Sequence, residues 1–145
     1  MNSDPLDFAD CTCANLRKAA RTVTQAYDAA LKPLGLKTTQ FTLLATIDKA
    51  GELPLVKLAE VLVMERTTLT RNLKPLQAAG YIEIRRGTDQ RVRHIGLTPA
   101  GDEMLAQACP AWEAVQTRIV KGLGTPNWQV LMQSLMSTIE TVHGR

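Results

Sequence analysis

The residues of this chain best suited to chemistry are hydrogen-bond donors, many of them positively charged, in two neighbouring groups. The first group comprises Arg66, Thr67, Thr68, Thr70, Arg71 and Lys74. The second is the run Arg85-Arg86-Gly87-Thr88-Asp89-Gln90-Arg91-Val92-Arg93. A guanidinium presents a planar fork of donors that matches phosphate oxygens and the acceptor edge of guanine, and threonine can contact a phosphate or a thymine methyl group. Both groups therefore predict contact with a nucleic acid.

The spacing of apolar residues predicts the elements that hold these groups. Residues 65–79 place Leu69, Leu73 and Leu76 on one stripe and the threonines and arginines on another, so one helix face packs and the other is free. A shorter helix, residues 55–62, precedes it. Residues 81–97 alternate as a two-stranded ribbon that turns at Gly87-Thr88-Asp89. These parts are typical of a winged helix-turn-helix.

The distribution of charge agrees with this interpretation. The net charge of the 145 residues is only +3, but residues 57–93 contain eight basic and four acidic residues. Positive charge is thus concentrated where phosphates would bind. A solvated helix face and a hairpin salt bridge are the alternative interpretations. The second explains the ribbon poorly, because one acid at its tip cannot account for four arginines.

Length and composition indicate one modest domain, residues 1–145, and exclude several classes of protein. The chain lacks a paired-carboxylate site, a nucleophile with its histidine base and a phosphate-binding glycine loop, so we expect no enzyme, no cofactor and no metal site. No apolar run is long enough for a membrane span, and the N-terminus does not resemble a secretory signal. We therefore expect a cytoplasmic protein with no membrane partner.

Helices of apolar character flank the winged region, residues 38–98. We expect residues 10–33 and 99–145 to form long helices whose stripes include Leu16, Leu105 and Leu131. A small DNA-reading region cannot cover these stripes alone, so they predict a homodimer, which also suits two DNA half-sites. A monomeric helical bundle is the alternative.

The chain resembles the MarR (multiple antibiotic resistance regulator) family of bacterial transcription regulators over nearly its whole length. The resemblance rests on Leu58-Ala59-Glu60-Val61-Leu62, Arg66-Thr67-Thr68-Leu69-Thr70-Arg71-Asn72-Leu73, Leu76, Gly80-Tyr81-Ile82, Asp89-Gln90-Arg91 and Leu97-Thr98-Pro99-Ala100-Gly101. It implies a mainly α fold with a small β-wing (α+β): a winged helix-turn-helix with N- and C-terminal dimerisation helices, in a triangular homodimer. The expected partner is double-stranded DNA with a palindromic operator, and repression is favoured because the chain has no further domain to recruit polymerase.

Within the wing, Arg91 flanked by Arg86 and Arg93 suits insertion into a narrow minor groove, with Asp89 holding Arg91 in place. The resemblance implies the same roles for Asp89 and Arg91. Two positions depart from the family pattern. Val63 stands where a glycine commonly relieves a left-handed turn, which predicts a rebuilt turn. Pro75 should kink or end the reading helix, leaving residues 76–79 for packing.

The sequence does not specify which signal controls such a regulator. Cys11 and Cys13 stand at the start of the first helix, where the helix terminus favours a reactive thiolate. Some members of the family that this chain resembles sense peroxides through an N-terminal cysteine. Oxidation, soft-metal binding by four thiolates across a dimer, and plain packing all remain open.

A small-molecule effector is a further candidate, with Tyr27, Phe41 and Trp112 lining a cleft between helices. Aromatic residues at helical spacing are also typical of a core. A winged helix can instead serve as a protein-interaction adaptor; DNA binding differs from this in its steep dependence on salt.

Overall fold

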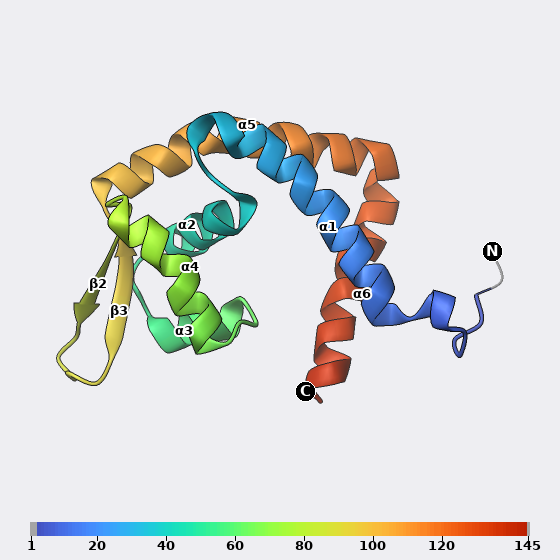
Figure 1. Ribbon diagram of the computed structural model, residues 1–145, viewed down its shortest axis with the longest axis horizontal. Helices are drawn as coiled ribbons and strands as arrows, with labels where there is room; N and C mark the ends of the chain where they lie inside the picture. The colour runs from blue at the N-terminus through green and yellow to red at the C-terminus, as the bar shows by residue number, and fades with distance from the viewer. Residues whose placement is uncertain (1–2, 145) are drawn as a thin grey trace.

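The chain folds as a series of helices interrupted by one small sheet, in a computed structural model that describes residues 3–144 (Figure 1). In chain order the elements are η1 (Phe8–Asp10), α1 (Thr12–Leu31), η2 (Lys32–Leu34), α2 (Thr38–Ala50), β1 (Leu53–Pro54), α3 (Leu55–Val61), α4 (Arg66–Ala78), β2 (Ile82–Arg86), β3 (Arg93–Leu97), α5 (Pro99–Leu123) and α6 (Thr125–His143). The predicted fold class, mainly α with a small β-wing, is confirmed. No helix of the described residues has the length and apolar character to cross a membrane.

The sheet has three antiparallel strands in the order β1-β3-β2. Strands β2 and β3 pair with Ile84 opposite Ile95 and Arg86 opposite Arg93. The sequence predicted only these two strands. The third, β1, is two residues long and contains Pro54, which is tolerated because β1 lies at the edge of the sheet.

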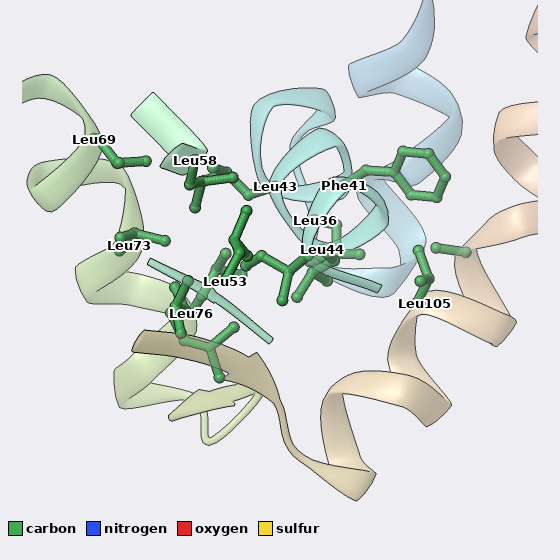
Figure 2. Packing of buried hydrophobic residues seen from close by; sticks show 14 of the residues in the cluster. Leu36, Phe41, Leu43, Leu44, Leu53, Leu58, Leu69, Leu73, Leu76 and Leu105 are labelled. Atoms are coloured by element: carbon green, nitrogen blue, oxygen red, sulfur yellow. The ribbon is translucent and has the colours of Figure 1, made fainter. Parts of the chain in front are cut away.

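One hydrophobic core joins the helix-turn-helix to the sheet and to α5. Figure 2 shows Leu58, Leu69, Leu73 and Leu76 of α3 and α4 on one side and Phe41 with Leu105 on the other. Leu44 of α2 lies between them and is fully buried. The three leucines predicted for the stripe of α4 are at most 2% exposed. Helix α4 is therefore anchored along its whole inner face.

The start of α5 is held by backbone contacts against Tyr81, in the segment between α4 and β2. Thr98 caps α5, since its Oγ1 accepts a hydrogen bond from the Gly101 amide at 3.1 Å. The Thr98 amide donates to the Tyr81 carbonyl at 3.0 Å. A Cβ atom on Gly101 would lie 2.0 Å from that same carbonyl oxygen. Only glycine lets the long helix approach the strand entry this closely.

The terminal helices leave much apolar surface uncovered. Helix α1 runs beside α5, and α6 folds back from the end of α5 at Gly124, which has a φ of 83° (Figure 1). No described residue of α6 is buried, and the exposed apolar side chains of its faces are Val130, Leu131, Met132, Met136, Ile139 and Val142. On α1, Leu16 and Val23 are likewise exposed. A single chain does not bury these stripes.

Candidate nucleic-acid interface

Helix α4 presents the predicted polar face to solvent. Burial of its leucine stripe turns outward Arg66, Thr67, Thr70, Arg71 and Lys74, all of which are exposed, while Thr68 is half-buried. None of these side chains takes part in an ion pair within residues 3–144. Their donors are therefore available to an external acceptor.

The turn between α3 and α4 keeps a left-handed residue although that residue is a valine. Val63 has a φ of 51°, and it is the one non-glycine residue with positive φ between residues 3 and 144. The Met64 amide donates to the Ala59 carbonyl at 2.9 Å, and the Val63 amide donates to Glu60 at 3.1 Å. The prediction of a rebuilt turn is wrong, because these bonds hold the turn despite the steric cost at a β-branched residue.

Helix α4 does not end at Pro75, as the sequence allowed, but continues to Ala78. The ring removes one amide donor, while Leu73 and Leu76 on either side remain buried and hold the helix to the core. Only Leu76 of residues 76–79 serves the core; Gln77 is exposed. Gln77 lies three residues after Lys74 and extends the polar face beyond the proline, a periodicity that the sequence analysis missed.

The wing tip is ordered by Asp89. The Arg91 amide donates to Asp89 Oδ1 at 3.0 Å, and Arg91 Nε donates to the same oxygen at 3.3 Å. The turn closes through Val92 N–H to the Asp89 carbonyl at 3.0 Å. The hydrogen bond from the Arg91 backbone, then that from its side chain, lowers the pKa of the Asp89 carboxyl. The Arg91 side chain is 90% exposed, so Asp89 holds the Arg91 side chain in place while the guanidinium remains open to solvent.

The arginines of β2 and β3 differ in whether they form an ion pair. Arg85 forms an ion pair with Glu83, and the hydrogen bond and charge of Glu83 raise the pKa of Arg85. Arg86 and Arg93 lie directly opposite each other across the strands and are both exposed. From the sequence we treated the four arginines of the wing as one group, and the pattern did not distinguish the ion-paired arginine from the others.

The two N-terminal cysteines are exposed at the start of α1. Cys11 is the N-cap residue and makes no side-chain capping hydrogen bond, and Cys13 lies in the first turn. The short segment before them is held by Asp7, which accepts from the Ala9 amide at 2.8 Å. Within residues 3–144 no three histidine, cysteine or acidic residues gather at a metal-binding distance.

The aromatic residues proposed for an effector cleft take part in packing between helices. Phe41 and Trp112 stack with ring centroids 5.7 Å apart, and Phe41 belongs to the core. Tyr27 is buried and its hydroxyl hydrogen-bonds to Gln116 of α5; burial raises its pKa. A cavity of about 540 Å³ lies elsewhere, where the α3–α4 turn faces Ile139 and His143 of α6.

The fold and this surface together define a winged helix-turn-helix protein. The MarR family model matches residues 36–92. The solved structure of the transcriptional regulator MosR of M. tuberculosis in complex with DNA is 36% identical, covers 92% of this chain and 97% of its own, and has a TM-score of 0.85.

Two further relatives agree in fold or sequence. A MarR mutant from E. coli, complexed with operator DNA, is 22% identical over 94% of this chain and 99% of its own, with a TM-score of 0.82. The HTH-type regulator YwoH of Bacillus subtilis is 26% identical over 88 residues, which are 61% of this chain. The match spans 64% of the length of YwoH. The chain belongs to the MarR family.

Proposed function

We propose that this protein is a transcriptional regulator that binds double-stranded DNA in a sequence-specific manner. Helix α4 enters the major groove, where Arg66 or Arg71 reads guanine and the threonines contact phosphates or a thymine methyl group. The wing inserts Arg91 into the adjoining minor groove. The observation that carries this proposal is the face of α4: its leucines are buried and its cationic and hydroxyl side chains are exposed without ion-pair partners among the described residues.

The regulator acts as a homodimer on a palindromic operator. Its dimerisation regions are residues 10–33 and 99–145, and the exposed stripes of α1 and α6 support this because burying them needs a second surface. Two copies present two copies of α4 to successive half-sites. The dimer represses transcription by occluding a promoter, without catalytic activity, in the cytoplasm where the DNA lies. The DNA complex of MosR supports the choice of partner.

A small molecule or an oxidant releases the dimer from DNA. A ligand that separates Phe41 from Trp112 would move α2 relative to α5, since the stacked rings join these helices. Such a ligand shifts the equilibrium only by its difference in affinity for the two states.

Thiol oxidation is the second candidate signal, favoured by the exposure of Cys11 and Cys13. A peroxide accepts two electrons and becomes two waters, or a water and an alcohol, while two thiols lose their protons and form one disulfide. A bond between Cys11 and Cys13 would unwind the first turn of α1, where Cys13 lies. Mass spectrometry after mild peroxide treatment tests this; unmodified thiols with unchanged DNA affinity would exclude it.

Selection of bound duplexes from a genomic fragment pool tests the main proposal. We expect enriched sites with two-fold symmetry and half-sites about one helical turn apart. The affinity should fall steeply as the salt concentration rises, since binding releases counterions from phosphates. Failure to retard any enriched duplex in dilute buffer would overturn DNA binding, and binding to a protein partner with little salt dependence would favour an adaptor instead.

A further inference from the structure

The base of the wing carries two arginines that face each other across the strands. Arg86 of β2 and Arg93 of β3 are register partners, two residues beyond the pair formed by Ile84 and Ile95. Because side chains alternate along a strand, Arg86 lies on the same face of the sheet as Ile84, and Arg93 on the same face as Ile95. Ile95 is fully buried in the core. The arginine pair therefore continues the core-facing side of the ribbon out to its exposed end.

This pair is electrostatically unsatisfied. Among residues 3–144 the ion pairs are Lys57–Glu60, Arg85–Glu83 and Arg91–Asp89, and none includes Arg86 or Arg93. Like charges placed directly opposite each other on a sheet destabilise it. A bound anion would turn this repulsion into two charge-assisted hydrogen-bonding sites.

A hollow beside the pair connects the wing to the reading helix. It has a volume of about 250 Å³ and is lined by Gln77, Ile84, Arg85, Arg86 and Arg93. Gln77 lies seven residues after Thr70 and three after Lys74, on the polar face of α4. Its amide adds a neutral donor on the helix side of the hollow. The hollow thus has donors from both DNA-reading elements and guanidinium charges on one side.

We infer that Gln77, Arg86 and Arg93 form a cradle for one phosphodiester group of the DNA strand that passes between α4 and the wing. This inference rests on the proposed function. It gives Arg86 and Arg93 a role separate from that of Arg91: they hold the backbone between the two grooves, whereas Arg91 enters the minor groove. Contacts of this kind set the position of the protein on the duplex and carry no base preference.

Arg85 supplies a matched control within the same strand. It is adjacent to Arg86 and also lines the hollow, but its guanidinium is paired with Glu83. Arg85→Gln removes the same charge from the same ribbon as Arg86→Gln. Only the loss of a cradle residue should remove a phosphate contact.

The test uses the full-length protein and a bound duplex from the selection, with single phosphates replaced in turn by uncharged methylphosphonate. For the wild type, we expect one position in each half-site, between the two contacted grooves, where the replacement weakens binding about tenfold. In the doubly substituted Arg86→Gln, Arg93→Gln protein, that penalty should disappear. Gln77→Ala should reduce it, and Arg85→Gln should leave it intact.

The outcomes separate the cradle from the proposed function. If the wild type binds no duplex, DNA binding itself fails. If it binds, but the penalty persists in the double variant or Arg85→Gln abolishes it equally, the cradle is wrong while DNA binding stands. The melting temperature of Arg93→Gln checks folding: it should not fall, because the substitution removes a like-charge contact. A lower melting temperature with loss of folded protein would contradict the interpretation that Arg86 and Arg93 repel each other.

Discussion

At the scale of single residues, the wing carries a carboxylate, Asp89, among arginines that we propose bind a polyanion. Asp89 accepts hydrogen bonds from the backbone and the side chain of Arg91, which lowers its pKa. A negative charge near DNA normally opposes binding. If Asp89 mainly positions Arg91, however, its removal will weaken binding rather than strengthen it. The sign of the effect decides between these roles.

We predict that Asp89→Asn lowers DNA affinity several-fold in a fluorescence anisotropy titration, because the asparagine keeps the size but loses the charged acceptor. Glu83→Gln is the control, since it removes a wing carboxylate that does not contact Arg91; its affinity should be unchanged or higher. In the folded protein the Asp89 carboxylate stays ionised down to its lowered pKa and is protonated as the pH falls through that pKa. The wild type and Asp89→Asn should therefore converge in acid, and tighter binding by Asp89→Asn would contradict the positioning role.

The strained turn at Val63 gives a prediction about stability. A left-handed conformation costs an L-residue roughly 1–2 kcal/mol, and asparagine tolerates it better than valine. We expect Val63→Asn to stabilise the protein by about 1 kcal/mol in urea unfolding. Val56→Asn is the matched control, since Val56 is 50% exposed and Val63 is 54% exposed. It lies within α3 without a positive φ and should gain nothing; equal effects would show that the turn carries no strain.

For Gly101 we predict a change in stability of the opposite sign, a destabilisation. A Cβ there would meet the Tyr81 carbonyl at 2.0 Å, so Gly101→Ala must push α5 away from the sheet. We expect a loss of about 1–3 kcal/mol in urea unfolding, the usual cost of overpacking. Gly122→Ala in the same helix meets nothing within 4 Å and should be neutral or stabilising. Equal stability of both variants would mean that the α5 contact is not tight.

At the scale of elements, α4 and the wing should divide the work of recognition. Arg71→Ala should change sequence preference, with a cost of about 1–3 kcal/mol at the base pair it reads. Arg91→Ala should weaken binding to all sequences and reduce the slope of log affinity against log salt by about 1. Lys57→Ala is the control, because Lys57 lies on α3 and pairs with Glu60 at 3.2 Å. Affinity measured over a duplex library at several salt concentrations checks this, and equal binding by Arg91→Ala would remove the wing from the interface.

At the scale of the whole molecule, we propose that the uncovered apolar stripes of the terminal helices join two copies of the chain. Leu131 lies on the apolar side of α6 and is 41% exposed in the single chain. We expect Leu131→Glu to give a folded monomer by light scattering that binds operator DNA far more weakly, since only one half-site is contacted at a time. Gln133→Glu adds the same charge elsewhere on α6, at another exposed position, and should stay dimeric. A dimer in both variants would place the interface elsewhere.

Much of this architecture could be predicted because local patterns in the sequence already specify it. The leucine spacing of α4, the turn residues of the wing and the Thr98-Pro99 start of α5 all act within a few residues of themselves. Their physical causes, burial of a stripe and capping of a helix end, need little information about distant parts of the chain. The predictions of the helices and of the two main strands were therefore correct.

Tertiary packing decided what local patterns could not. The continuation of α4 through Pro75 depends on leucines anchored in a shared core, and β1 exists because Leu53 lies opposite Ile95. The left-handed conformation of Val63 persists because the hydrogen bonds of the Val63 and Met64 amides outweigh a local preference. The hollow at the base of the wing needs residues from α4, β2 and β3 at once. Sequence spacing thus determined which residues face outward. Only the folded chain decided which charged side chains pair with one another and which remain unpaired, because ion pairing depends on distance in space.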